Sequence, residues 1–211
     1  YRITDDLLLQ GIISDSYYLL EGLNAGWNIA SGATRPDASS LDSSKLLGQE
    51  WTSQETRTRR YNAKLFWDIS ESVNLRTAYM QEKTTRSGDS SDLTFQANGT
   101  YSLESSYDPT EQEILGQGAY AFLDFEFDTG DINHQATFGI QASESYWNSP
   151  NYNDSSVTQT GLSLSSSTPS ISQPIAPIVT SISKDVYHLN SINFTLGDSI
   201  TFNPNWSLLV G

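Results

Sequence analysis

The chain has 211 residues, of which 36% are hydrophobic and 17% are charged, and its formal net charge is −14. Both fractions are lower than in ordinary globular domains, which are about 45–50% apolar and about 25% charged. The acidic balance argues against nucleic-acid binding, and the lack of cysteine excludes disulfides and thiolate metal sites. No run approaches the roughly 18 apolar residues of a membrane-spanning helix, a test that transmembrane β-barrels escape because their strands alternate apolar and polar residues.

Short turns and long polar segments alternate along the chain. The sequence predicts strands at residues 1–3, 7–15, 51–69, 73–85, 111–127, 132–146, 185–202 and 206–211. The short turns are expected at 4–6, 70–72, 128–131 and 203–205. The polar segments 17–49, 87–98 and 147–183 are predicted as loops, and the last is rich in Ser and Pro with no core-forming pattern. Residues 100–108 are either a hairpin arm above the main strands or the start of the next one.

The clearest strand pattern lies at 119–146. Leu123 and Phe125 fall on one face of its first strand, and Asp124 and Glu126 fall on the other. This period of two indicates β-structure rather than helix. The two strands exceed ten residues, whereas ordinary strands have about five or six. A tilted strand needs about 9–11 residues to cross a bilayer, so the length and the polar second face indicate a membrane barrel with a wet lumen.

The alternation of short and long connections predicts an all-β fold, an antiparallel up-and-down transmembrane β-barrel segment with about six to eight long strands in an open, curved sheet. Aromatic residues near both kinds of connection fit two membrane-interface girdles, although strands favour aromatics in any case. Both chain ends fall within strand patterns, so we expect an internal piece of a longer protein. Two alternatives are a complete small eight-stranded barrel or porin, and a soluble all-β carbohydrate-binding module.

Four stretches resemble recurring segments of TonB-dependent siderophore receptors. They are FEFDTGDINHQATFGIQAS at 125–143, INFTLGDSITFNPNWSLLVG at 192–211, YRITDDLLLQG at 1–11 and FWDISESVNLRTAY at 66–79. Their order and spacing match the barrel of such receptors. The chain departs from the pattern where Gln141 and Ala142 follow Ile140, positions at which the family often has an acidic residue and Tyr.

The resemblance implies that residues 1–211 form part of a receptor barrel in the outer membrane of a Gram-negative cell. Neither the plug domain nor the TonB box of the family is present in this sequence. The implied function is uptake of ferric siderophores, with the siderophore as transported ligand and no resident cofactor. The implied partners are outer-membrane lipid, the siderophore, and TonB acting through the plug, with no nucleic acid.

Candidate functional residues fall into two groups. Five are expected to face the lumen, where carboxylates pair with basic groups: Arg60, Lys64, Arg76, Asp124 and Glu126. Five aromatics in the predicted extracellular loops are candidates for stacking on a ferric chelate: Tyr17, Tyr18, Trp27, Trp147 and Tyr152. No catalytic motif is found, so we expect no enzyme.

Two other sets of polar residues are weaker candidates. His134 and His188, the only histidines, are expected to be structural rather than metal ligands. Asp89 and Asp92 have oxygen ligands suited to a hard cation, but their spacing matches no known loop, so a solvated loop is favoured over a metal site.

Overall fold

The computed structural model describes residues 1–42, 44–152, 155–182 and 187–211. Its main element is an eight-stranded antiparallel sheet in the order β1-β2-β4-β5-β8-β9-β13-β14. The strands are β1 (Arg2–Thr4), β2 (Leu7–Glu21), β4 (Ser53–Ser70), β5 (Val73–Gly88), β8 (Gln112–Thr129), β9 (Ile132–Asn148), β13 (Tyr187–Asn203) and β14 (Trp206–Val210). Except for β1 and β14 at the edges, they have 15–18 residues each. At about 3.3 Å per residue they are about 50–60 Å long.

Each long strand has an apolar face and a polar face over the half nearest the short turns. The apolar face is defined by residues that the register aligns across the sheet, namely Leu9, Ile13, Leu65, Tyr61, Leu75, Tyr79, Leu123, Phe125, Phe138, Ile140, Ile192, Phe194 and Leu196. The polar face has the residues between them, including Gln10, Lys64, Asn62, Arg76, Asp124, Thr137, Gln141, Thr195 and Asn193. The sheet therefore has two chemically different faces.

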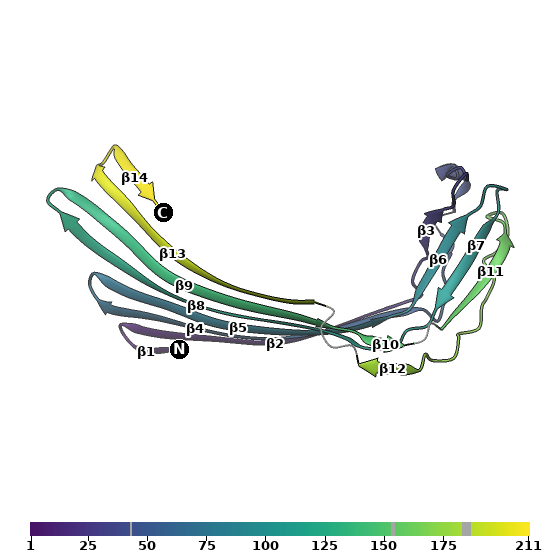
Figure 1. The fold of residues 1–211 in the computed structure, drawn as a ribbon, viewed down its shortest axis with the longest axis horizontal. Coiled ribbons are helices and arrows are strands. Elements are labelled where there is room, and N and C mark those ends of the chain that lie inside the picture. The colour runs from purple at the N-terminus through teal and green to yellow at the C-terminus, as the bar shows by residue number, and fades with distance from the viewer. Residues whose placement is uncertain (43, 153–154, 183–186) are drawn as a thin grey trace.

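The hairpin turns gather at one end of the sheet (Figure 1). They join β1 to β2, β4 to β5, β8 to β9 and β13 to β14. At the β8–β9 turn Gly130 has a φ of 64°, a backbone conformation that residues with a Cβ rarely adopt. The connections at the other end are long and fold into a separate body, at the right of Figure 1.

This body, here called the lobe, comprises the described residues within 22–52, 89–111 and 149–182. Its four-stranded sheet has the order β11-β7-β6-β3. The strands are β3 (Gly26–Ile29), β6 (Ser90–Phe95), β7 (Tyr101–Ser106) and β11 (Ser156–Leu162). A two-stranded ribbon of β10 (Pro150–Tyr152) and β12 (Val179–Ile182) and a single 3-10 turn, η1 (Ala38–Ser40), complete it.

The lobe has a hydrophobic core formed by all three of its segments. Leu93 and Leu103 are completely buried, and Tyr101 is 2% exposed. Ala25, Leu47, Phe95 and Ile171 complete the cluster. Burial raises the pKa of the Tyr101 phenol, because the charged form would lose its hydration. The long connections are thus a packed unit rather than independent loops.

The structure confirms the all-β class and the open antiparallel sheet, and it corrects the loop predictions. Residues 90–95 are strand β6, because Ser91, Leu93 and Phe95 alternate into the lobe core and pair with β7. The prediction that 147–183 is a long loop is also wrong, since Ser156–Leu162 form β11 and Ile171 is buried in the lobe core although the segment has no core-forming pattern. Of the two alternatives for residues 100–108, the hairpin arm above the main strands is correct.

Neither alternative architecture agrees with the structure. The edge strands β1 and β14 do not pair with each other, so the sheet is not a closed eight-stranded barrel. A soluble sandwich would bury Phe125 and Ile140 between two sheets, but they are 36% and 40% exposed. In the part of the chain that the structure describes, no helix is long and apolar enough to cross a membrane.

Candidate functional site

The polar face carries a charged cluster near the short turns, and strand register assembles it. Arg76 of β5 lies directly opposite Phe122, and Asp124 is two residues further along β8. Arg76 Nε donates to Asp124 Oδ2 at 2.5 Å, and its Nη2 donates to Asp124 Oδ1 at 2.9 Å. Thr137 of β9 donates its hydroxyl to Asp124 Oδ1 at 2.7 Å. The carboxylate therefore links three adjacent strands.

An aromatic side chain fixes the position of this arginine. The Arg76 guanidinium carbon is 5.3 Å from the centroid of the Phe122 ring, a cation–π distance. The same ring also lies against Gly139, where an added Cβ would be only 2.0 Å from Phe122 Cδ1. Tyr120 packs against Phe122 at 5.2 Å between ring centroids. Glycine is required at 139 because only a hydrogen fits under the ring.

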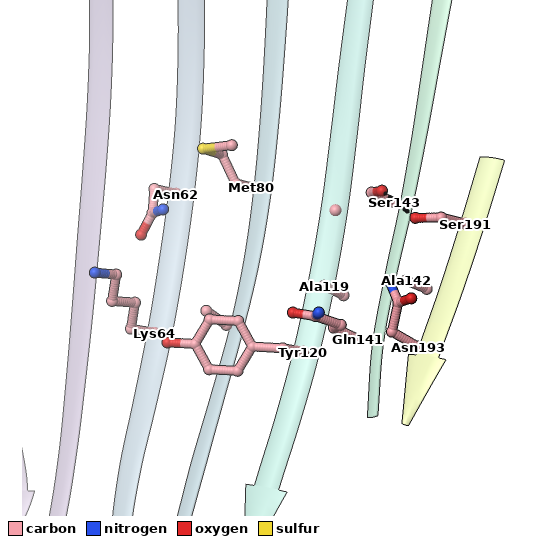
Figure 2. A pocket seen from close by; sticks show the side chains of 12 residues that line it. Asn62, Lys64, Met80, Ala119, Tyr120, Gln141, Ala142, Ser143, Ser191 and Asn193 are labelled. Carbon is pink, nitrogen blue, oxygen red and sulfur yellow. Dashed lines mark hydrogen bonds between the residues drawn. The ribbon is translucent and has the colours of Figure 1, made fainter. Parts of the chain in front are cut away.

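Further from the short turns, the polar face is hollowed into a depression of about 440 Å³. Ala78 and Gly118 are among the small residues that line it. Asn62, Lys64 and Met80 lie to one side of it (Figure 2). The Tyr120 ring extends across toward Lys64 from β8, and Ser143, Ser191 and Asn193 lie on the opposite side in Figure 2. Its lining of amides, hydroxyls and one ammonium group can make hydrogen bonds with a polar partner.

A second polar-face group lies where the sheet meets the lobe. Arg86 Nε donates to Gln112 Oε1 at 3.0 Å, and the guanidinium carbon is 5.3 Å from the Trp147 ring centroid. Trp147 Nε1 is buried and has no hydrogen-bond partner among the described residues. Tyr18 shares the row of Arg86, since both pair with Thr56, which places it two strands away, or about 10 Å. These side chains offer aromatic surface and N–H donors.

The five residues predicted to face the lumen lie on one face of the sheet. Arg76 contacts Asp124, Arg60 forms an ion pair with Glu82, and Lys64 borders the depression. Glu126 accepts a hydrogen bond from Asn133 Nδ2 at 3.3 Å.

The five aromatics predicted in loops all lie in strands, so that part of the prediction is wrong. These strand positions lie toward the lobe or within it. Tyr17 and Tyr18 are in β2 and point to opposite faces, because the β2–β4 ladder continues to Glu21. Trp147 is in β9, which pairs with β8 as far as Asn148. The long strands thus extend beyond the predicted boundaries. The structure does not bring the five aromatics together.

The remaining two aromatics belong to the lobe. Trp27 is in β3 and packs against Phe95 with 5.4 Å between ring centroids. Tyr152 ends β10, and its side chain lies outside the described part of the structure.

Sequence reasoning did not single out Arg86 and Gln112. A signal was available, because Arg86 lies one residue beyond the predicted strand 73–85 and ten residues from Arg76, so a slightly longer strand places both on one face. Contact with Trp147 could not be read in this way, since it depends on the register across β5, β8 and β9.

The two histidines lie on the apolar-face side of the ladder, far apart. His134 Nδ1 is 2.8 Å from Asp198 Oδ2, and its ring stacks on Phe127. His188 Nε2 is 3.0 Å from Glu144 Oε1, and its ring stacks on Tyr146. Each histidine thus has one carboxylate partner and one aromatic partner. No group of three or more His, Cys, Asp or Glu side chains suited to a metal ion occurs within the described ranges.

Two loop carboxylates that sequence reasoning associated with cations have structural roles. Asp89 is 8% exposed, and its carboxylate accepts hydrogen bonds from the backbone N–H groups of Ser53 and Asp108. It therefore ties the β6 segment to the start of β4. Asp92 belongs to β6 and pairs with Glu104 in the β6–β7 hairpin. The prediction of a solvated loop is wrong for both residues.

Comparison with known proteins gives a clear answer for the fold. No protein-family model and no curated protein matches the sequence. Among solved structures, the ferric preacinetobactin receptor BauA from Acinetobacter baumannii matches 95% of this chain with a TM-score of 0.74 and 17% identity. The ferric-catecholate import receptor Fiu from E. coli K12, in its open form, matches 96% with a TM-score of 0.60 and 13% identity. The siderophore receptor PiuA from A. baumannii matches 94% with a TM-score of 0.60 and 16% identity.

These likenesses confirm the resemblance to TonB-dependent siderophore receptors at the level of the fold. The chain spans 30–33% of the lengths of these three structures. These three neighbours are receptors rather than enzymes.

Proposed function

We propose that the chain forms part of the wall and extracellular surface of a TonB-dependent outer-membrane receptor for ferric siderophores. The single observation behind this proposal is the long curved sheet with one apolar and one polar face, short turns at one end and a folded lobe at the other. In this arrangement the apolar face contacts lipid and the polar face lines the lumen. The short turns are periplasmic, and the lobe is extracellular.

The exposed apolar side chains support the membrane placement. Phe194 and Leu196 are both 72% exposed, and they are neighbours on one face of β13. At roughly 25 cal/mol per Å² of apolar surface, leaving such side chains in water would be costly across the whole face. A bilayer removes that cost, because hydrocarbon solvates them.

In this proposal, the residues that contact the ferric siderophore are Tyr18, Arg86 and Trp147. These side chains share the polar face where the sheet meets the lobe, the position that an arriving ligand reaches first. An aromatic ring stacks on planar chelating groups, and a guanidinium attracts the negative charge of the chelating oxygens. Trp147 and Tyr18 were candidates from the sequence, and Arg86 joins them through the strand register.

The energy for release is proposed to come through a plug and TonB. The Arg76–Asp124–Thr137 cluster and the polar depression provide hydrogen-bonding groups on the wall against which a plug would pack. A partly exposed ion pair such as Arg76–Asp124 contributes about 1 kcal/mol or less to stability, so its partners can change at little cost.

The test is uptake of radiolabelled ferric siderophores by iron-limited cells that produce the full-length protein containing this chain. We expect the protein in the outer-membrane fraction and uptake of at least one ferric siderophore that requires TonB. Arg86→Gln is expected to weaken ligand binding. Lys64→Gln, on the same face but nearer the short turns, should weaken it less. A protein found in the soluble fraction would refute the membrane placement, and uptake that persists without TonB would refute the mechanism.

A further inference from the structure

Three basic residues form one patch on the side of the sheet that the proposed function assigns to lipid. Arg57 and Arg59 of β4 and Lys83 of β5 line a single depression of about 260 Å³, together with Thr85 and Glu111. In the described strands of the eight-stranded sheet, these three are the Lys and Arg residues on the apolar-face side. The other basic residues of β4 and β5, such as Arg60 and Arg76, lie on the polar face. The patch, called here the outer basic patch, is therefore a local concentration.

The outer basic patch lies on the lobe side of the apolar side chains that cover this face, here called the apolar band. Ile13 pairs with Tyr61, and the next row on the same face contains Arg59 and Lys83. Ile69, near the short turn, is ten residues from Arg59, which is about 33 Å along a strand. With a barrel tilt of about 40° this distance is roughly 25 Å across the membrane, the height of the apolar band of such barrels. The patch therefore falls at the level of the outer-leaflet headgroups.

Carboxylates hold these cations in place but leave donors free. Arg57 uses Nε and Nη2 for Asp15, at 2.9 and 2.6 Å, and Arg59 uses only Nε, at 3.3 Å. Lys83 Nζ is 2.5 Å from Glu113 Oε2. Since a guanidinium has five N–H donors and an ammonium has three, each residue retains donors for another acceptor. Glu111 lines the same depression, and Glu55, two residues before Arg57 on the same face of β4, also acts on that guanidinium. The remaining N–H donors, rather than an excess of positive charge, are therefore what this site offers to an anion.

We propose that the outer basic patch binds the phosphate group of a lipid in the outer leaflet. Phosphate matches the guanidinium fork and attracts the lysine ammonium, and the acyl chains of the same lipid would lie along the apolar band below. A soluble anion has no reason to prefer this face, since its lower half is apolar. The inference rests on the membrane placement in the proposed function.

The test measures lipid binding by the full-length protein in detergent micelles. The probes are a fluorescent lipid A carrying two phosphates and the same glycolipid after phosphate removal, with inorganic phosphate as competitor. At about 1 kcal/mol for each basic residue near a charged surface, replacing all three by Gln should weaken binding of the phosphorylated lipid roughly 100-fold. Lys83→Gln alone should weaken it about fivefold.

Arg60→Gln is the matched control, because Arg60 is the neighbour of Arg59 on β4 and faces the other way. It should leave lipid binding unchanged. The proposal is overturned if the triple variant binds phosphorylated lipid as the wild type does, if the phosphate-free lipid binds equally well, or if millimolar inorganic phosphate displaces the lipid. Should the triple variant fail to assemble, the single variants decide between the same outcomes.

Membrane fractionation separates this inference from the proposed function. A protein that resides in the outer membrane but does not distinguish the two lipids contradicts the lipid site alone. A protein that is absent from the outer membrane contradicts the proposed function, and with it the premise of the site.

Discussion

On the apolar face of the eight-stranded sheet, side chains such as Phe194 and Leu196 are 72% exposed, whereas in the lobe Leu93 and Leu103 have no exposed surface. The two regions alternate along one chain, since β5 leads into β6 and β7 returns to β8. The lobe buries its apolar residues against one another, as water-soluble proteins do. The apolar face of the sheet instead stays exposed, and under the proposed function a bilayer covers it. The comparison shows that neighbouring segments of one sequence place their apolar residues in two different ways, buried in the lobe and exposed on one face of the sheet.

Deleting part of the lobe core should have the largest effect. Leu103→Ala is expected to destabilise the lobe by about 2–5 kcal/mol, because Leu103 is completely buried and a cavity would replace its side chain. Hydrogen exchange of the lobe amides measures this, and exchange in β8 and β9 should not change. Ile178→Ala is the control, since Ile178 is 73% exposed. Equal loss of protection in the lobe and the long strands would mean that the two regions are one cooperative unit.

A charged residue introduced on either face of β13 tests which face contacts lipid and which contacts water. Phe194→Arg is expected to destabilise the protein by about 2–4 kcal/mol in lipid vesicles, as charged side chains do on the lipid face near the bilayer midplane. Asn193→Arg, one residue away on the polar face, should cost much less. The measurement is denaturant unfolding of the full-length protein in vesicles. If both substitutions cost the same, the two faces do not have different solvents.

The sequence predicts the sheet better than the lobe, for a physical reason. A long strand repeats its alternation of apolar and polar residues many times. In each of their strands, Arg76 and Asp124 therefore fall on the face opposite the apolar residues, and the sequence places both on the polar face. The lobe core instead combines Leu47, Leu93 and Ile171 from three distant segments. Each segment has too few apolar residues to form a pattern of its own.

In the candidate site, too, the sequence predicts which face of the sheet a residue lies on but not which residues it contacts. Period-two counting assigns a residue to a face, but contacts between strands depend on register. Arg86 meets Trp147 because β5 pairs with β8 and β8 pairs with β9 in one particular alignment. The parallel pairing of β3 with β6 in the lobe is likewise a long-range contact that local patterns do not contain.

A single buried amide should test how the first and third lobe segments are joined. Gln49 is 3% exposed; its Nε2 donates to Pro169 O at 3.0 Å, and its Oε1 accepts from Ile171 N at 2.8 Å. Gln49→Ala leaves both backbone groups without partners, which should cost about 1–3 kcal/mol. Hydrogen exchange at Ile171 should accelerate.

The control for this join is Gln96→Ala. The Gln96 side chain makes only longer hydrogen bonds, at 3.3 and 3.4 Å, within the β6–β7 hairpin. Its loss should leave exchange at Ile171 unchanged. Equal acceleration in both variants would indicate a general loosening of the lobe, and the specific role of Gln49 would then be rejected.

The smallest expected effect is a pH dependence confined to the lobe. Burial raises the pKa of Tyr101 above its ordinary value of 10.0, so the folded lobe favours the neutral phenol. The resulting stability is complete below pH 10 and is lost as the pH rises from there through the folded pKa, because the unfolded chain releases this proton first. Proteolysis of the lobe between pH 9 and about 11 should therefore accelerate. Tyr101→Phe should flatten this dependence; an unchanged slope in that variant would assign the alkaline sensitivity to other groups.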